Sequence, residues 1–286
     1  MKTALLFSGL GDPTTRTAVQ QGLAKDSPLI KRALLASNCT AESLFSDGGQ
    51  LLGVSDVIQP LITAVSLTEA ICSREEGLEV DYLAGHSLGE VAAWACAGAM
   101  SPEDAVEIAA VRGRSMGRAA RTHEGDMLAL TDIDADGLQQ ILTIGRKHGQ
   151  LTVGAYNAPR EVVLTGTLPA LQAVAPFCQS RRLNVGGPWH SPLMEAAKPE
   201  LAAALGRVCI RQQIRPVVSG INGDCVNNTR DIVSQFLAQL TEPLRWTTVL
   251  ATLASLEVER FVIAGPGRVL RYLIRRNLPW AEVKLI

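Results

Sequence analysis

The sequence predicts an α/β protein with a large subdomain and a small inserted one, and two observations lead to this prediction. Short apolar segments that end at glycine turns alternate with segments of helical periodicity, which is typical of a mostly parallel sheet covered on both faces. Residues 1–123 and 190–286 follow this pattern and are expected to form the large subdomain. Residues 124–189 are expected to form the small one, because the elements over 125–187 follow the ferredoxin-like order βαββαβ.

The composition is that of a globular protein with a substantial core. The chain has 286 residues, of which 47% are hydrophobic and 19% charged, enough for a large domain and a smaller one. The net charge of -1 and the lack of a basic run with interleaved aromatics argue against nucleic-acid binding. No apolar segment approaches the ~20 residues of a membrane span, and the first apolar run, of about five residues, is too short for a signal peptide.

The cysteine pattern indicates reduced thiols. The six cysteines are scattered and form no CxxC pair, which in a chain of this size is typical of a cytosolic protein. We therefore expect a soluble, cytoplasmic protein without a membrane partner, a nucleic-acid partner, a metal or a bound cofactor.

Hydrophobic periodicity defines the elements expected in the large subdomain. The expected strands are residues 3–7, 80–87, 215–220 and 260–267. The expected helices are residues 60–72, 89–100, 101–120, 190–206, 231–240, 246–256 and 269–276. Pro60 suits a first helical turn, and Ser101 suits an N-cap followed by acidic residues that the helix dipole favours.

The small subdomain has its own set of expected elements. Its strands are predicted at residues 125–133, 151–159, 160–166 and 181–187. Its helices are predicted at residues 134–149 and 167–180.

Residues 85–89, with the sequence GHSLG, match the GxSxG nucleophile elbow, with a strand before it and a helix after it. The two glycines allow a tight reversal and close packing of the helix on the strand, which leaves Ser87 at the tip of a strained turn. The main-chain amide of Leu88 lies at a helix N-terminus, where partial positive charge collects. Acyl transfer needs this combination of a nucleophilic oxygen and amide donors for an oxyanion. We therefore expect an α/β-hydrolase-like large subdomain with Ser87 as nucleophile.

A serine nucleophile needs a base, and the chain offers four histidines. His86 is too close in sequence to reach Ser87 well and is expected to be hydrogen-bonded beneath the turn. His123 and His148 lie in polar segments typical of a surface loop and a helix end. His190 follows the small subdomain at its junction with the large one, and we expect it to be the general base.

The order of these residues separates two reaction classes. An ordinary α/β-hydrolase has its serine first, then the acid, then a histidine near the C-terminus. Here no histidine follows His190. A dyad whose histidine is oriented by something other than a carboxylate fits this order better.

The chain resembles the malonyl-CoA:acyl carrier protein transacylases and the related acyltransferases of polyketide synthases. The resemblance covers nearly the whole chain and rests on six segments in family order. These are GHSLGE (85–90), VRGRSM (111–116), YNAPREVVLTG (156–166), WHSPLM (189–194), QLTEPLRW (239–246) and GPGRVL (265–270).

The resemblance implies a role for each catalytic residue. Ser87 takes the acyl group as an ester and His190 is its base. The backbone carbonyl of Gln239 holds the imidazole in the productive tautomer. The backbone amides of Leu88 and Leu10 form the oxyanion hole.

The resemblance also implies the substrate contacts. Arg112 matches the family arginine that grips the free carboxylate of malonyl groups, and a guanidinium fork binds a carboxylate bidentately. Gln59 matches a glutamine of the family cleft. Trp189 and His86 complete the expected substrate-binding set.

Two positions depart from the family pattern. The N-terminal signature usually has proline and glutamine around its first glycine, whereas this chain has Ser8-Gly9-Leu10-Gly11-Asp12. An oxyanion donor at the Leu10 main chain survives this change. Trp189 stands where relatives often carry phenylalanine or serine, a position tied to the size of the accepted α-substituent, so the tryptophan either restricts the pocket or lines a different one.

The implied function is transfer of a malonyl-type group from coenzyme A, through an acyl-serine, to the phosphopantetheine thiol of an acyl carrier protein. The pathway stays open between a polyketide or other specialised assembly line served in trans and a malonate decarboxylase. The alternatives are a thioester hydrolase, a carrier-to-carrier acyltransferase and a catalytically silent scaffold. The acyl group, the carrier and the oligomeric state are not fixed by the sequence.

Overall fold

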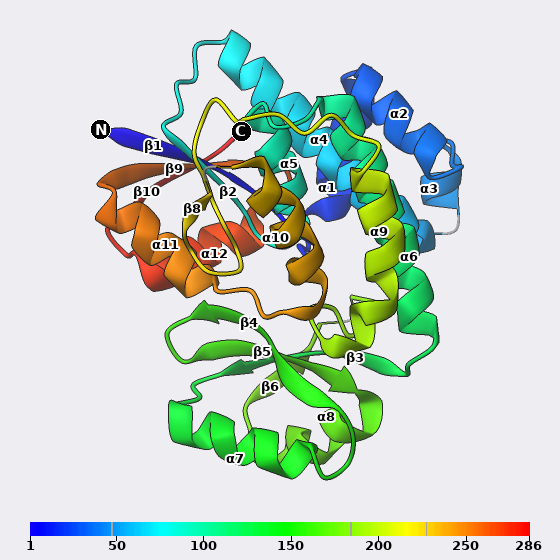
Figure 1. Cartoon of the computed structure of the whole chain (residues 1–286), viewed down its shortest axis with the longest axis vertical. Coiled ribbons are helices and arrows are strands. Elements are labelled where there is room, and N and C mark those ends of the chain that lie inside the picture. The colour runs from blue at the N-terminus through cyan, green and yellow to red at the C-terminus, as the bar shows by residue number, and fades with distance from the viewer. Residues whose placement is uncertain (47, 184, 227) are drawn as a thin grey trace.

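The computed structural model describes residues 1–46, 48–183, 185–226 and 228–286. Over these residues the chain forms a six-stranded and a four-stranded sheet, each with its own helices, and Figure 1 shows the larger sheet above the smaller one. The predicted fold class is confirmed, since a mostly parallel sheet stands beside an antiparallel one in the ferredoxin-like order.

The larger sheet has the strand order β10-β9-β1-β2-β7-β8. Its strands are β1 (Lys2–Phe7), β2 (Tyr82–Gly85), β7 (Val217–Val218), β8 (Cys225–Val226), β9 (Val258–Ala264) and β10 (Glu282–Leu285). Neighbouring strands pair in parallel except β7 and β8, which are antiparallel. Side chains of β1 point alternately to the two faces, so that Leu5 and Phe7 enter one apolar cluster and Ala4 and Leu6 the other.

Helices cover both faces of this sheet, as its two apolar faces require. On the Leu5 side lie α4 (Ser55–Glu75) and α5 (Gly89–Cys96), with α6 (Pro102–Arg121) packed on α4. On the opposite side lie α11 (Trp246–Ser255) and α12 (Arg268–Asn277), as Figure 1 shows.

The remaining elements of the large subdomain surround this core. They are α1 (Thr15–Ala24), α2 (Pro28–Ala36), α3 (Ser43–Ser46), α9 (Lys198–Leu205), α10 (Thr229–Thr241) and the short 3₁₀ helices η1 (Gln50–Gly53) and η3 (Pro192–Ala197). None of the helices in the described ranges is long and apolar enough to span a bilayer.

The smaller sheet is antiparallel with the order β4-β5-β3-β6. Its elements are β3 (Gly125–Thr131), α7 (Ala135–Gly145), β4 (Leu151–Ala158), β5 (Glu161–Thr167), α8 (Leu168–Val174), η2 (Ala175–Phe177) and β6 (Ser180–Arg182). One face packs on α7 and α8 through side chains such as Leu130 and Leu164, on the side away from the larger sheet (Figure 1). The other face presents Met127, Ala155 and Val163 to the large subdomain. These strands all fall within 124–189, although the subdomain boundaries themselves stay a prediction.

Several expected elements differ in extent from the structure, and three of them have a clear local cause or limit. The helix expected from Pro60 begins at Ser55, so that the proline lies inside α4 and removes only one main-chain donor. The helix expected over 190–206 begins only at Pro192, because the left-handed backbone of His190 (φ 58°) cannot be part of a helix. It is also split into η3 and α9, with a proline in the first turn of each piece. The strand expected over 181–187 is shorter, and its residue 184 lies outside the described residues.

Candidate active site

The nucleophile elbow lies where two parallel strands end side by side. Because β1 and β2 are parallel neighbours, the turns that follow them meet at the same edge of the sheet. Ser87 adopts a left-handed backbone conformation, with φ 54°, at the tip of the turn. The following helix approaches β1 so closely that a Cβ atom on Gly89 would lie 2.0 Å from the Phe7 carbonyl oxygen. Only glycine fits there, so the second glycine of the motif permits the elbow.

Ser87 and His190 form a buried hydrogen-bonded pair, with 2.8 Å between Ser87 Oγ and His190 Nε2. On the other side of the ring, His190 Nδ1 lies 2.6 Å from the main-chain oxygen of Gln239. A carbonyl only accepts, so Nδ1 carries the proton and Nε2 is free to accept one from the serine. The Gln239 carbonyl belongs to the last turn of α10, whose carbonyls lack helical partners.

Electrostatics keep the His190 imidazole neutral. Burial, and then the positive charge of Arg112, lower its pKa to about 3. A neutral imidazole at pH 7 is able to accept the serine proton. His86 has a different environment: its Nε2 lies 3.0 Å from Asn157 Oδ1 of β4, and its ring meets Trp246 edge-on.

Arg112 is a buried cation beside the nucleophile. It is 1% exposed, its Nη1 donates to Gln59 Oε1 at 2.7 Å, and its Nη2 donates to the Gln239 side-chain oxygen at 3.0 Å. The same Nη2 lies 3.5 Å from Ser87 Oγ. Burial lowers the Arg112 pKa to about 10, which leaves the group charged at pH 7. Across the described part of the chain it makes no ion pair.

Arg112 hydrogen-bonds only to neutral side chains, and the charge of Glu90, which acts on it without an ion pair, only partly offsets its burial, so an anion from a ligand would complete its environment. The two glutamine oxygens satisfy part of the guanidinium fork, whereas Arg112 Nε has no hydrogen-bond partner among the described residues. The arrangement therefore suits a carboxylate of a ligand whose reacting carbon lies against Ser87.

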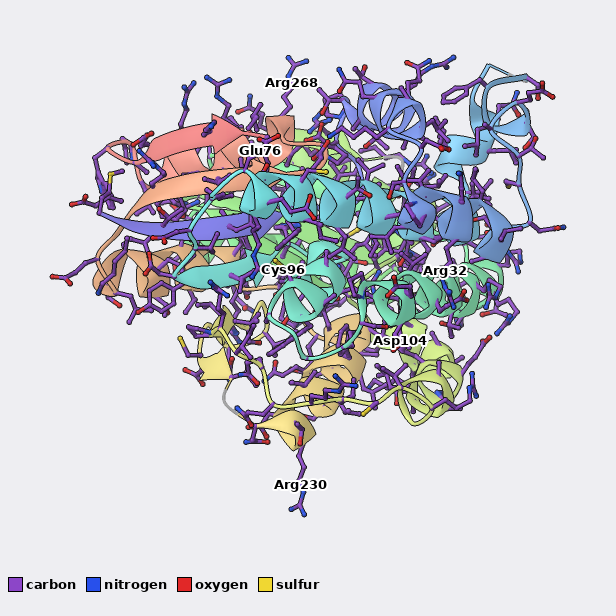
Figure 2. The ribbon with its side chains drawn as sticks, turned by 90° about the horizontal axis from the view of Figure 1, so that it is seen from above. Arg32, Glu76, Cys96, Asp104, Arg230 and Arg268 are labelled. Carbon is purple, nitrogen blue, oxygen red and sulfur yellow. The ribbon has the colours of Figure 1, made fainter. Side chains whose placement is uncertain are left out.

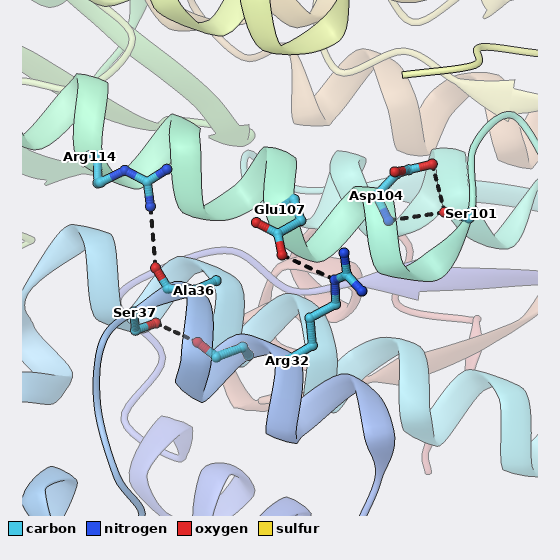
Figure 3. A network of polar contacts seen from close by, with 8 residues as sticks. Arg32, Ala36, Ser37, Ser101, Asp104, Glu107 and Arg114 are labelled. Carbon is cyan, nitrogen blue, oxygen red and sulfur yellow. Dashed lines mark hydrogen bonds and ion pairs between the residues drawn. The ribbon is translucent and has the colours of Figure 1, made fainter. Parts of the chain in front are cut away.

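Contacts with α2 fix the position of α6, which carries Arg112. Figure 3 shows that Arg114 donates to the Ala36 carbonyl oxygen at 3.2 Å and that Arg32 pairs with Glu107 at 3.1 Å. The start of the helix is capped as predicted, since Ser101 Oγ accepts from the Asp104 main-chain N–H at 3.0 Å.

The loop after β1 passes directly beside the elbow. A Cβ atom on Gly9 would lie 2.6 Å from the His86 main-chain oxygen and 3.3 Å from Ser87 Cβ, so glycine permits this approach. The main-chain N–H groups of Leu10 and Leu88 have no acceptor among the residues that the structure describes. Two free amides, one in the loop beside the elbow and one directly after Ser87, suit an oxyanion.

The site opens into a cleft of about 620 Å³ between the two subdomains. The inner face of the small sheet supplies apolar side chains, and Trp189 lies along the wall with its indole N–H donating to the Val185 carbonyl at 3.0 Å. Arg181 and Arg268 also line the cleft, and Figure 2 shows Arg268 extending outward from the start of α12. The lining is thus mainly apolar, and its charged groups include two arginines at the rim and the carboxylate of Glu161.

The structure brings together the residues that the sequence singled out. Ser87, His190, Arg112, Gln59 and Gln239 form one hydrogen-bonded cluster. The cleft is lined by Trp189, His86 and Leu10. The two remaining histidines, at 123 and 148, are exposed, as predicted.

Sequence reasoning missed two buried polar groups at the site. Glu90, 1% exposed, ends the GHSLGE segment and accepts from the Gln239 side-chain amide. Burial raises its pKa to about 7. Asn157 belongs to the YNAP segment and binds His86. A carboxylate in a helix that is apolar nearly all round was the available signal for Glu90.

Comparison with known proteins places these observations in context. Residues 33–224 match the family model described as the acyl transferase domain. A malonyl CoA-acyl carrier protein transacylase of Bacillus subtilis is 30% identical, covering 96% of this chain and 90% of the relative. The enzyme of the same name from Synechocystis is 27% identical over 100% of this chain and 97% of its own length.

Solved structures agree with the sequence relatives. The crystal structure of a protein named MCAT from Streptococcus pneumoniae superposes with a TM-score of 0.85 at 26% identity, covering 100% of this chain and 96% of that one.

Proposed function

Since this chain belongs to the acyl transferase family that includes the malonyl CoA-acyl carrier protein transacylases, we propose that it moves a malonyl group from coenzyme A to an acyl carrier protein. One observation carries the choice of acyl group: the buried, unpaired guanidinium of Arg112 lies 3.5 Å from the oxygen of a serine already bonded to a neutral histidine. A short acyl group with a carboxylate at its far end matches both groups at once.

In the first half-reaction Ser87 Oγ attacks the thioester carbonyl carbon while its proton passes to His190 Nε2. The oxyanion that forms accepts from the amides of Leu88 and Leu10. The intermediate then collapses: the C–S bond breaks, the coenzyme A sulfur leaves with the proton from His190, and the malonyl group stays on Ser87 as an ester.

The second half-reaction reverses these roles with a new thiol. The phosphopantetheine thiol of the carrier gives its proton to His190, and the sulfur attacks the ester carbonyl. The C–O bond to Ser87 breaks, the serine oxygen regains the proton, and the carrier leaves with the acyl group. The Gln239 carbonyl orients the imidazole in both directions and stabilises the transient imidazolium.

The cleft supports this sequence of steps. Its apolar lining suits the exclusion of water, which would otherwise hydrolyse the acyl-serine. Arg181 and Arg268 suit the phosphate groups of coenzyme A and of the carrier's prosthetic arm. We place the reaction in the cytoplasm, in keeping with the six free cysteines of the chain.

The test is incubation with labelled malonyl-CoA, alone and with a holo acyl carrier protein, followed by mass analysis. We expect a malonyl adduct on Ser87 that disappears on addition of the carrier, together with malonyl-carrier product. Ser87→Ala gives no adduct. An adduct that persists in this variant would contradict the proposal. Release of free malonate in place of carrier product would indicate a hydrolase. Loading only from an acylated carrier would indicate a carrier-to-carrier transferase.

A further inference from the structure

We propose that Glu90 is a positioning residue that fixes the orientation of the Gln239 side-chain amide and, through it, directs Arg112 toward the acyl carboxylate. The proposal rests on the proposed malonyl transfer and adds a residue that acts at a distance from the reacting atoms. It concerns selectivity for the carboxylate rather than the ester chemistry itself.

The Gln239 side chain forms a bridge between Arg112 and Glu90. Its oxygen accepts from Arg112 Nη2 at 3.0 Å, and its nitrogen donates to Glu90 Oε2. The three groups come from α6, α10 and α5, and all three residues are 1% exposed. Water therefore does not compete for either hydrogen bond.

The Gln239 side-chain amide has two unlike ends, an oxygen that accepts and a nitrogen that donates. Arg112 only donates, so it must face the amide oxygen, and Glu90 offers an acceptor oxygen to the amide nitrogen in both its ionised and its protonated form. If Glu90 lost its acceptor, the nitrogen of Gln239 would be buried without a partner, which is costly. Only the Arg112 bond would then hold the amide in its present orientation, and any turn that found its nitrogen a partner would present N–H groups to the guanidinium.

The orientation of the Gln239 amide bears on the binding of the substrate. Only Gln59 and Gln239 accept from the terminal nitrogens of Arg112 at 3.0 Å or less among the described residues. With one of the two lost, the guanidinium is held by α4 alone, and its fork is no longer directed at the acyl group. Ser87 and His190 keep their own hydrogen bond, because the His190 ring is held by the main-chain oxygen of Gln239 rather than by its side chain.

The experiment compares two substitutions of Glu90 with respect to malonyl and acetyl loading. Glu90→Gln keeps an acceptor oxygen toward Gln239 and is expected to discriminate malonyl from acetyl within about threefold of the wild type. Glu90→Met keeps the side-chain volume and removes the acceptor. We expect it to lower kcat/KM for malonyl loading roughly ten- to a hundredfold, mainly through a higher KM. Acetyl loading should change little. Glu69→Gln, at a buried carboxylate bound to the Gly265 main-chain N–H, serves as the matched control.

A double-mutant cycle with Gln239→Ala tests the route. If Glu90 acts through the amide, Glu90→Met has no further effect on malonyl selectivity in the Gln239→Ala background. An undiminished effect there, or wild-type selectivity in Glu90→Met, overturns the inference. Should Glu90→Met not fold, Glu90→Leu, which also removes the acceptor, carries the same test. If the wild-type protein does not load malonyl at all, the proposed function is wrong. If the wild type loads malonyl and the Glu90 variants keep its selectivity for malonyl over acetyl, only the role of Glu90 is wrong.

Discussion

Arg112 and Gln239 are separated by 127 positions in the sequence, yet the Arg112 guanidinium donates to the Gln239 side-chain oxygen at 3.0 Å. The same glutamine accepts from the His190 ring through its main-chain oxygen at 2.6 Å. One residue of α10 thus supports both the cation and the base of the candidate site.

Two replacements of Arg112 distinguish the effect of its positive charge on malonyl loading from the effect of its planar shape. Arg112→Ala is expected to lose malonyl loading by roughly ten- to a hundredfold, the scale of a buried charged hydrogen bond, while acetyl loading changes little. Arg112→Lys keeps the charge but not the planar fork, and its loss should be intermediate. Covalent loading of Ser87 from each thioester, followed by mass, measures the ratio. Equal loading of acetyl and malonyl in the wild type would contradict the clamp.

The pH dependence of loading reports the environment of His190. The lowered pKa of this ring, about 3 against an ordinary 6.5, keeps the base neutral far into acid, so kcat/KM should show no fall near pH 6.5. Arg112→Ala removes the second cause of the lowering, so the pKa rises and the acid limb moves to higher pH. Burial, the larger cause, remains, so the return toward 6.5 is partial.

Acetyl-CoA is the substrate for this measurement, because it needs no cation. A Glu90→Gln background removes the titration of the neighbouring carboxyl, whose pKa is about 7. If the acid limb of the pH profile stays in place in Arg112→Ala, the charge of Arg112 does not lower the pKa of His190.

The elbow glycine tests the local geometry. Gly89→Ala places a methyl group 2.0 Å from the Phe7 carbonyl oxygen, so α5 or β1 must shift. We expect a loss of about 1–3 kcal/mol in the free energy of unfolding, with loss of acyl loading as the elbow moves. Gly53→Ala, where a Cβ atom meets nothing within 4 Å, is the control. Denaturant midpoints compare the two, and equal midpoints would refute the close approach.

Trp189 tests the size of the acyl cleft. Trp189→Ala is expected to cost about 3–5 kcal/mol of stability and to raise loading of an α-substituted malonyl group relative to malonyl, because the side chain is buried against the cleft. Trp189→Phe keeps a ring and loses the bond to the Val185 carbonyl, at about 1 kcal/mol. Trp280→Ala, at a tryptophan 58% exposed, is the control. Unchanged acyl preference in Trp189→Ala would place the size limit elsewhere.

Much of this architecture follows from local patterns in the sequence. The elbow is readable because its two glycines, its apolar strand and its apolar helix lie within about a dozen residues, and the α6 cap at Ser101 is likewise local. The strands β8 and β10 were not predicted, because one is two residues long and the other mostly exposed, so neither has an apolar run.

The contacts of the site are harder to predict than its residues. Arg112 sits in a helix that on sequence grounds also suits a surface cation, and only the packing of α6 against α4 shows that it is buried. Glu90 was overlooked for a related reason. Its acceptor role depends on Gln239, 149 positions away, and no periodicity of the chain encodes that distance.

The position of Gln239 at the end of α10 has a consequence for the lifetime of the active state. A single thirteen-residue helix supports two of the three groups that act on the substrate. Brief fraying of its last turn therefore disconnects the imidazole and the guanidinium together, while both sheets stay intact. We expect inactivation on heating to precede the global melting transition, with amide exchange at the C-terminal end of α10 rising in step with it.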